Sequence, residues 1–480
     1  MTSPPPRARP RVGFLGIGLA AYWPQFEGLH DRLLGYQREV EERLAGLGAD
    51  VVSAGLVDTS EGAREAGDLL AAGGVDIVMV YAATYATSAQ VLPAVRAAKA
   101  PVVILNLQPT RSLGYESMTT GEWLANCSAC CVPELAGAFT RARIPYSTVT
   151  GTLLDGDPAW DSLRSWIEAA AAVRGARRAR FGFLGHNYPG MLDMYSDFTQ
   201  IQAQIGSHIE ILEIDDLVAR VEGASAAEIA RKSEEIRDAF EFAVPGVDPI
   251  AGEIDPERFE WSARVAVGLD RLVADFALDG LTYYYRGVDG NVNERVGAGL
   301  IVGNSLLTAR GIPTAGEADL KTNVAMLLLD RLGAGGSYTE FYALDFDEEF
   351  VLMGHDGPGH VAIADGRPVL RALELFHGKS GAGLSVEMKV RLGPVTILGL
   401  SQTSDGNLKL LAAEGESIAG PTFRIGNTNS RIRFAKGPAA FMDAWCAEGP
   451  THHVALGVGH RAGDIRRIAS LLDLELAVVA

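Results

Sequence analysis

The chain has 480 residues, which is too long for one hydrophobic core, because cores stop growing near about 250–300 residues. Apolar residues make up 48% and charged residues 21%, the profile of a folded globular protein. With 42 Lys and Arg against 60 Asp and Glu, the net charge is −18. Such an acidic chain repels phosphate backbones and anionic lipid, so we expect neither nucleic acid nor membrane surfaces as partners.

The sequence also bears on the compartment. No apolar run approaches the ~20 residues that a membrane helix needs. The basic RARPR followed by VGFLGIGLAAYW is similar to a signal peptide, but its glycines suit a first β-strand and loop better. Cys127, Cys130 and Cys131 crowd together while Cys446 stands alone, which is not a disulfide framework. We therefore predict a cytoplasmic protein.

Residues 1–175 alternate short apolar runs with segments of helical spacing. The runs are RVGFLGIG, DVVSAGLV, DIVMVYAA, PVVILNL and PYSTVTGTL. Continuous Val, Ile and Leu runs joined by helices indicate a parallel sheet that is buried on both faces. We expect a doubly wound α/β domain here, of the flavodoxin/Rossmann-like kind.

Residues 176–332 repeat this organisation, and the strand candidates are RARFGFLGH, HIEILEI, LDGLTYYY and GIPTAGE. From about residue 333 the pattern changes to short strands separated by Gly, Asn, Asp and Pro turns. That change predicts a C-terminal domain over 333–480, a mostly antiparallel β-barrel-like sheet with helices. The predicted fold class is α/β, with two parallel-sheet domains followed by this β-rich domain.

The segment GIGLAA (16–21) matches the dinucleotide-binding pattern G-x-G-x-x-G/A, and Asp58 follows the second predicted strand as a candidate ribose ligand. In that pattern the helix begins within the glycine turn and presents its N-terminus to pyrophosphate. Here Tyr22, Trp23 and Pro24 intervene, and Pro24 suits a helix that begins afterwards. A loop that contacts a small polar ligand is therefore favoured over nicotinamide binding.

A second motif is Cys127-x-x-Cys130-Cys131, for which metal and redox roles are conceivable. Its segment EWLANCSACCVPELAGAFTRA has helical spacing, and the next cysteine is over three hundred residues away. We interpret the three cysteines as packed thiols on a buried or partly buried helix.

The C-terminal part concentrates metal-binding residue types. Six of the nine histidines lie in residues 355–480, namely His355, His360, His377, His452, His453 and His460. Just upstream, Glu317 lies where a predicted strand enters a helix, the edge at which α/β sheets bind ligands. Glu340 is flanked by aromatic residues, where an unpaired charge is costly. Two carboxylates and two imidazoles suit Mn²⁺, Co²⁺ or Mg²⁺ better than a structural zinc site.

Each of these residues also has a structural explanation. Glu317 could stabilise the first turn of its helix, and Glu340 could be a charge on an edge strand. His452 and His453 are consecutive, so on a strand they face opposite sides and at most one points into a given site. Only the joint pattern favours a metal centre.

The same segments resemble the L-arabinose isomerase / L-fucose isomerase superfamily of metal-dependent aldose–ketose isomerases. The resemblance is most specific in GEADLKT, SYTEFYALDF, VLMGHD and the C-terminal GPTHHVALGVGHRAGDIRRIASLLDLELAVV. It implies that Glu317, Glu340, His355 and His453 hold a divalent metal, with Mn²⁺ as first choice and Mg²⁺ or Co²⁺ as alternatives. It also implies a homo-oligomer, a trimer or hexamer, with a sugar as substrate.

The implied reaction interconverts an aldose and a ketose through a metal-stabilised cis-enediol, with Glu317 and Glu340 shuttling the proton. Asp319 and Lys321 are expected to orient the metal ligands. The residues expected to contact the sugar are Tyr22, His186, Tyr285 and His452.

The sequence departs from arabinose isomerases in three places. Leu19 and Ala20 replace a Gln-His pair of that family, and Cys130 stands where those enzymes carry a histidine that reaches a neighbouring subunit's site. The segment GHNYPGMLDMYSD (185–197) is also unlike the arabinose enzymes. We therefore expect a different sugar or polyol aldehyde. The alternatives are a non-catalytic sugar-binding or sensor protein and a metal-dependent epimerase of the same superfamily.

Overall fold

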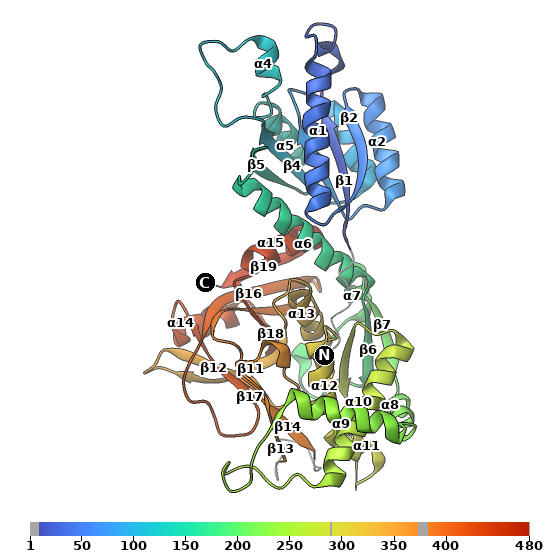
Figure 1. Cartoon of the computed structure of the whole chain (residues 1–480), viewed down its shortest axis with the longest axis vertical. Helices are drawn as coiled ribbons and strands as arrows, with labels where there is room; N and C mark the ends of the chain where they lie inside the picture. Colours follow the sequence, from blue (N-terminus) through green and yellow to red (C-terminus); the bar gives the residue numbers. More distant parts are fainter. Residues whose placement is uncertain (1–8, 289, 373–382, 480) are drawn as a thin grey trace. The chain divides into compact units, whose positions relative to one another are not determined.

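The computed structural model describes residues 9–288, 290–372 and 383–479. The chain forms two compact units, with the boundary between Arg174 and Gly175, and both are drawn in Figure 1. The further division predicted at residue 332/333 falls inside the second unit and stays a prediction. Among the described residues, no helix is both long and apolar enough to cross a membrane.

The N-terminal unit is a five-stranded parallel sheet with helices on its two faces, in the strand order β2-β1-β3-β4-β5. Its strands are β1 (Arg11–Ile17), β2 (Asp50–Val57), β3 (Ile77–Ala82), β4 (Val102–Gln108) and β5 (Tyr146–Thr152). Its helices are α1 (Leu29–Gly46), α2 (Ser60–Gly73), α3 (Leu92–Ala98), α4 (Thr120–Leu124), α5 (Cys131–Ala142) and α6 (Pro158–Arg178), which runs past the boundary, with the short turns η1 (Ala20–Tyr22) and η2 (Ser88–Gln90).

Right-handed crossovers distribute these helices. The helices α2, α3 and α5 cover one face and bury residues such as Leu70 and Phe139 against the strands. The chain moves in the opposite direction between β1 and β2, so α1 lies on the other face, where it buries Leu33 and Val40. The carboxyl ends of all five strands meet at one edge.

The second unit begins with a four-stranded parallel sheet in the order β10-β9-β6-β7. Its strands are β6 (Arg180–Gly185), β7 (His208–Leu212), β9 (Gly280–Tyr284) and β10 (Thr314–Ala315). The helical segments around it are η3 (Leu192–Met194), α7 (Phe198–Gln204), α8 (Ile214–Glu222), α9 (Ala226–Ala239), α10 (Pro256–Phe276), α11 (Val292–Ala298), α12 (Leu300–Ala309), η4 (Gly316–Ala318) and α13 (Leu320–Arg331).

A closed antiparallel barrel follows. Its six strands pair in the order β15-β18-β11-β12-β17-β16, and β16 pairs with β15 to close the ring. They are β11 (Ser337–Asp345), β12 (Phe350–His355), β15 (Gly393–Gln402), β16 (Leu408–Ile418), β17 (Thr428–Phe434) and β18 (His453–Val458). The last strand, β19 (Glu475–Val479), adds to β16 in parallel, and the helices are η5 (Val361–Ile363), α14 (Pro438–Ala447) and α15 (Ala462–Leu472).

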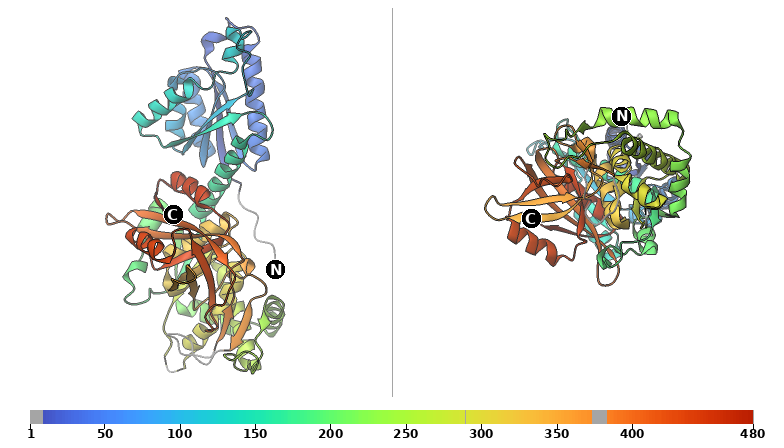
Figure 2. Two further views of the ribbon diagram at one scale, coloured as in Figure 1. Left: turned by 90° about the vertical axis from the view of Figure 1, so that its left-hand side faces the viewer. Right: turned by 90° about the horizontal axis from the view of Figure 1, so that it is seen from below.

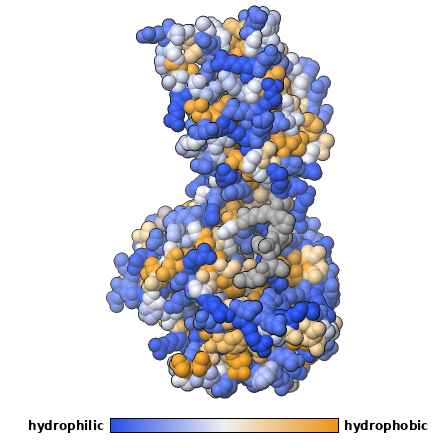
Figure 3. Space-filling model, in the orientation of Figure 1, coloured by the Kyte–Doolittle hydropathy of each residue, from blue (hydrophilic) through white to orange (hydrophobic). Residues whose placement is uncertain are grey.

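The barrel and the preceding α/β part are joined by a small sheet. The strands β13 (Val369–Ala372) and β14 (Leu384–Glu387) pair with each other, and β13 also pairs in parallel with β8 (Glu241–Phe242). In Figure 2 the orange and red strands of the barrel lie beside the green and yellow helices in both views. Hydrophilic residues, in blue, cover much of the face drawn in Figure 3, as expected from the net charge of −18.

The predicted fold class is confirmed: two parallel-sheet α/β parts precede a six-stranded antiparallel barrel with helices. The prediction that the three cysteines share one helix is wrong. The helix α4 ends at Leu124 and α5 begins at Cys131, so Cys127 and Cys130 lie in the turn between them. Pro133 explains the break, because a proline fits only the first turn of a helix.

Candidate metal centre

Three side chains from distant parts of the sequence meet beside the barrel. Glu317 lies in η4 after β10, His355 ends β12, and His453 begins β18. The Nε2 atoms of His355 and His453 are 3.2 Å apart, and Nε2 of His453 is 3.8 Å from Oε2 of Glu317. One ligand atom of each residue lies within 4.8 Å of the others, so the three could hold one cation.

Glu340 belongs to a second group around the same histidine. It lies on β11 directly opposite His453 on β18, and its carboxylate, His452 and His453 also place ligand atoms within 4.8 Å of one another. The prediction that at most one of His452 and His453 points into a given site is therefore wrong, because β18 begins only at His453 and the strand alternation does not reach His452. The four residues predicted as metal ligands are therefore neighbours of His453 or His453 itself. Their role as ligands stays a prediction.

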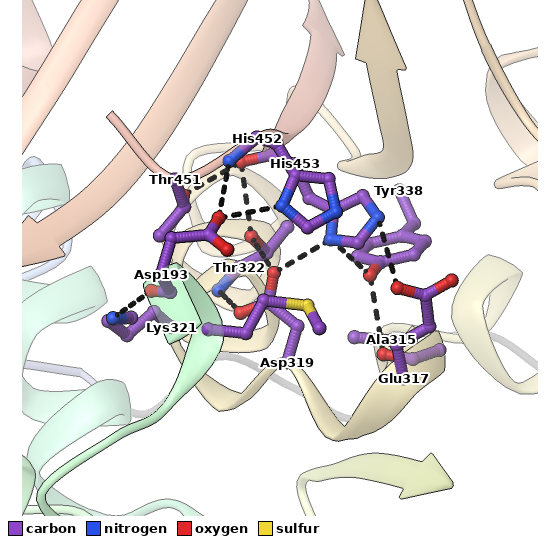
Figure 4. Close-up of polar contacts among 12 residues, drawn as sticks. Asp193, Ala315, Glu317, Asp319, Lys321, Thr322, Tyr338, Thr451, His452 and His453 are labelled. Carbon is purple, nitrogen blue, oxygen red and sulfur yellow. Dashed lines mark hydrogen bonds and ion pairs between the residues drawn. The ribbon is translucent and has the colours of Figure 1, made fainter. Parts of the chain in front are cut away.

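The backbone at Glu317 is strained. Glu317 has φ 60° and Ala318 has φ 59°, in the left-handed region that non-glycine residues avoid, at a cost of roughly 1–3 kcal/mol each. Neighbouring hydrogen bonds hold this turn, since Tyr188 N–H donates to Glu317 O and Asn187 Nδ2 donates to Ala318 O. Figure 4 shows the result, with the Glu317 carboxylate directed toward the ring of His453.

His453 is 1% exposed and is held by two oxygens. Its Nδ1 lies 3.1 Å from Oδ2 of Asp319 and 2.7 Å from the hydroxyl of Tyr338, which donates to Gly316 O. An ionised carboxylate only accepts, so Nδ1 carries a hydrogen, and in the neutral ring Nε2 has its lone pair on the side of His355 and Glu317. Metal-binding histidines are commonly oriented in this way by a carboxylate.

The carboxylates set the charge of this histidine. Burial lowers the pKa of His453, but the hydrogen bond that its Nδ1 donates to Asp319 and the charges of Asp319, Glu317 and Glu340 outweigh burial, so the pKa is raised above 6.5. Burial and the same carboxylates raise the pKa of Tyr338 well above 10.0, so its hydroxyl remains a neutral hydrogen-bonding group. The surroundings thus favour a positive charge where the two imidazoles meet.

His452 is fixed by an aspartate from the central α/β part. Asp193 Oδ2 accepts hydrogen bonds from the backbone N–H of His452 at 2.9 Å and from its Nδ1 at 2.6 Å (Figure 4). Burial raises the pKa of Asp193, but the hydrogen bonds from His452 outweigh it and the pKa is lowered. Lys321 donates to the backbone oxygens of Asp193 and Tyr195, so it holds this segment and does not contact a candidate ligand.

A cavity of about 370 Å³ adjoins the centre. Its lining includes Glu317 and His355 together with Tyr188, Tyr284 and Tyr285. The buried hydroxyl of Tyr285 has no hydrogen-bond partner among the described residues, so a ligand in the cavity could supply one. His186, a predicted sugar contact, is exposed, and its ring packs against Tyr284 at 5.2 Å between centroids.

Three further candidates belong to none of these groups. Tyr22 belongs to the N-terminal unit, where its pKa is raised by burial and by nearby Tyr85, Cys127 and Cys130, and its contact with a sugar stays a prediction. His360 lies 3.7 Å from Asp330, and His460 bonds to the backbone of Gly415. His377 lies outside the described residues.

The loop after β1 is built as the position of Pro24 predicts. The helix α1 begins only at Leu29, and Asp58 accepts a hydrogen bond of 2.6 Å from the indole N–H of Trp23. The glycine turn therefore does not run directly into a helix N-terminus, the feature on which pyrophosphate binding depends.

Two residues of the centre were missed from the sequence. Tyr338 precedes Glu340 by two positions, and alternate residues of a strand share a face, so a periodicity of two could have indicated it. Asp193 gave no local signal, because its partner His452 is 259 residues away.

Comparisons with known proteins agree with this geometry. No family model matches the chain. It is 26% identical over 419 residues to an L-arabinose isomerase from Nocardioides sp., covering 84% of this chain and 80% of the relative. The L-arabinose isomerases of Aeromonas salmonicida and Acidothermus cellulolyticus match with the same coverages, at 22% identity over 412 residues and 23% over 410 residues.

A solved structure was also matched. It is an ABC transporter periplasmic solute-binding protein from Actinobacillus succinogenes with bound D-allose, at 12% identity and a TM-score of 0.18, covering 68% of this chain and 92% of that one. At such a TM-score the likeness carries no argument.

The fold, the His/Glu groups and the distant homology together define an aldose–ketose isomerase-like protein. The chain is a divergent member of the superfamily of the L-arabinose isomerases, homologous to them over about 84% of its length.

Proposed function

We propose that the chain is a divalent-metal-dependent aldose–ketose isomerase acting on a sugar other than L-arabinose. The observation that carries the proposal is the meeting of Glu317, His355 and His453, from η4, β12 and β18, at the wall of a cavity. Homology to isomerases that act on a sugar supports the substrate class. Leu19, Ala20 and Cys130, which depart from the arabinose enzymes, support a different sugar.

The residues present fit a bound cation. The buried Oε2 of Glu317 has no hydrogen-bond partner among the described residues. The Nε2 atoms of His355 and His453 are 3.2 Å apart, so at most one of them can donate a hydrogen bond to the other. A divalent ion would give all three atoms a common partner. Mixed oxygen and nitrogen donors suit Mn²⁺, with Mg²⁺ and Co²⁺ as alternatives.

The reaction requires an acid and a base beside two adjacent carbons of the substrate. A C–H next to a carbonyl is a weak acid, and a divalent cation supplies Lewis-acid polarisation of the substrate oxygens, worth several kcal/mol. In the proposal, Glu317, Glu340, His355 and His453 hold the ion. The carboxylates of Glu317 and Glu340 also remove the proton from one carbon and return it to its neighbour through the substrate's cis-enediol, for which acid–base catalysis contributes roughly 10²–10⁴-fold.

Other residues position these groups and the sugar. Asp319 keeps Nδ1 of His453 protonated, which leaves Nε2 available. Asp193 fixes the ring of His452, a candidate contact for a sugar hydroxyl together with His186 and Tyr285. A cytoplasmic homo-oligomer, trimeric or hexameric, completes the proposal, and it rests on the cysteine pattern and on the resemblance.

The test begins with a screen of aldoses and ketoses against the Mn²⁺-loaded protein. Glu317→Gln and Glu340→Gln should each lower turnover of the best substrate by at least about 10²-fold while circular dichroism stays unchanged. Glu416→Gln, an exposed carboxylate on barrel strand β16, is the matched control and should keep full activity. Wild-type turnover in either site variant would refute the roles of these carboxylates.

Product analysis by NMR in D₂O separates the rival functions. An isomerase converts the aldose into a ketose and usually leaves solvent deuterium at the carbon that receives the proton. An epimerase gives an inverted stereocentre without changing the carbonyl position. Sugar binding without metal and without turnover would favour a non-catalytic sugar-binding or sensor protein.

A further inference from the structure

Two thiols lie in contact at the carboxyl edge of the N-terminal sheet. The Sγ atoms of Cys127 and Cys130 are 2.8 Å apart in the turn between α4 and α5. This separation exceeds the length of a disulfide bond, about 2.05 Å, by only about 0.8 Å. Both cysteines are reduced in the structure.

The two thiols differ in access. Cys127 is buried at 5% exposure, whereas Cys130 is exposed. A reagent in solution therefore reaches Cys130 first, and Cys127 lies directly behind it. This is the arrangement of an attacking and a resolving cysteine in thiol–disulfide exchange.

The thiol of the third cysteine of the motif makes hydrogen bonds to other residues. Cys131 is fully buried, and its Sγ donates to Ser128 O at 3.3 Å and Thr84 O at 3.5 Å. Burial raises the pKa of the Cys131 thiol to about 11, which keeps it protonated and unreactive near neutral pH. The geometry thus selects the pair Cys127–Cys130 from three adjacent cysteines.

We propose that Cys127 and Cys130 form a reversible dithiol–disulfide site, oxidised by low-molecular-weight disulfides of the glutathione class. The Cys130 thiolate attacks one sulfur of the small disulfide, which forms a mixed disulfide and releases one small thiolate. Cys127 then loses its proton to solvent, and its sulfur attacks Sγ of Cys130 and displaces the second small thiolate. Two protein thiols are oxidised to one disulfide, and one small disulfide is reduced to two thiols.

The order of the two steps follows from the surroundings of Cys127. Burial, the hydrogen bond with Cys130 and the charge of Cys130 raise the pKa of Cys127 to about 12. Cys127 is therefore a poor first nucleophile. Once Cys130 is bound in a mixed disulfide, its sulfur can no longer carry the negative charge that opposes ionisation of Cys127, so Cys127 ionises more readily and can complete the exchange.

The site adjoins the loop that follows β1. Tyr22 in η1 and Tyr85 after β3 lie close to the thiols, since the pKa of Tyr22 is raised by burial and by Tyr85, Cys127 and Cys130. Oxidation replaces two ionisable thiols beside Tyr22 with an uncharged disulfide.

The experiment equilibrates the full-length protein in glutathione buffers of increasing oxidised fraction, unfolds it in guanidinium chloride so that buried thiols react, labels the free thiols with iodoacetamide and digests with trypsin. All three cysteines of the motif fall in one peptide, 112–141, while Cys446 lies in another. In reducing buffer the peptide should carry three labels. In oxidising buffer it should carry one label, on Cys131, and fragmentation should show a bond between Cys127 and Cys130 that dithiothreitol reverses.

Variants separate this result from nonspecific oxidation. Cys130→Ser should prevent loss of the label from Cys127, whereas Cys446→Ser should leave the behaviour of the peptide unchanged. Cys131→Ala should still form the Cys127–Cys130 bond, and the wild-type peptide decides the question if that variant does not fold. Three labels on the wild-type peptide under oxidising conditions, glutathione retained on Cys130, or a bond to Cys131 would each overturn the proposal.

Discussion

The carboxyl edges of the two parallel sheets both carry polar side chains, but the elements that contribute the neighbouring side chains differ. At the N-terminal edge, Tyr22, Tyr85, Cys127 and Cys130 come from loops and short turns. At the edge of the central sheet, Glu317 is met by side chains from the barrel strands. The same kind of sheet edge thus supports two kinds of chemistry, according to what lies against it.

The difference is one of charge. Burial raises the pKa values of Tyr22 and Cys127, which keeps these groups neutral, so the N-terminal edge offers hydroxyls and thiols. Around His453, the charges of three carboxylates outweigh burial and favour a positive charge. A cation is therefore expected at the second edge, and hydrogen bonding or thiol exchange at the first.

Removal of the metal should have the largest effect. It should affect the edge of the central sheet and leave the N-terminal edge unchanged. Dialysis against a chelator should abolish isomerase activity, and Mn²⁺ should restore it, because the donors around His453 then regain their common partner. Mn²⁺ at 100 times its Kd should also stabilise the protein by about 2.7 kcal/mol. Full activity in the chelated protein would contradict the role of the metal.

Phe139→Ala should destabilise only the N-terminal unit. Phe139 is fully buried in the core between α5 and the sheet, and such truncations cost about 3–5 kcal/mol. Urea unfolding followed by limited proteolysis should show the loss in residues 9–174, with Mn²⁺ affinity of the second unit unchanged. Leu69→Ala, on the exposed side of α2 at 46% exposure, is the control and should have a small effect.

Asp319→Asn tests the orientation of His453. The amide carries no charge, and its NH₂ can donate a hydrogen bond to Nδ1. This favours the tautomer with the hydrogen on Nε2, so the lone pair of Nε2 is no longer free to bind a metal. Changes of this kind weaken metal affinity by about 10–100-fold, which titration calorimetry with Mn²⁺ can measure. Asp319 also caps α13, because its side chain accepts a hydrogen bond from the backbone N–H of Thr322. Asp255→Asn is the matched control, because Asp255 caps α10 in the same way, and it should leave metal affinity unchanged.

The smallest effect is expected at Glu228 in α9, which belongs to neither edge. Hydrogen bonds from Ser225 and Arg271 lower its pKa from 4.5 to about 2. Its contribution is therefore fully present above pH 4.5 and is lost as the pH falls toward 2. Glu228→Gln should lower the Tm slightly at pH 7 and hardly at pH 2, whereas Glu234→Gln on the same helix should leave the Tm unchanged at both pH values.

The sequence was sufficient to predict the strands and a barrel-like C-terminal domain, but not which strands pair to close the ring. Continuous apolar runs such as DIVMVYAA and VTILGL correspond to β3 and β15, because buried parallel and barrel strands lack polar alternation. Closure of the ring depends on pairings such as β11 with β18, which join residues more than a hundred positions apart. No local pattern determines such pairings.

The site was predicted unevenly for the same reason. Glu317, Glu340, His355 and His453 were named because the resemblance joined segments that the sequence separates, and the structure brings them together. Asp193 was missed because its role depends on contact with the distant His452. Cys127 and Cys130 were placed on a helix because a turn between two helices can keep helical apolar spacing.

Closure of the barrel bears on the thermal stability of the candidate metal centre. Every barrel strand has two neighbours, so none can slide along another without breaking hydrogen bonds on both of its sides. Glu340 and His453 face each other across adjacent strands, and the spacing between them is therefore as durable as the ring itself. Heating should thus leave this pair intact until the whole ring opens.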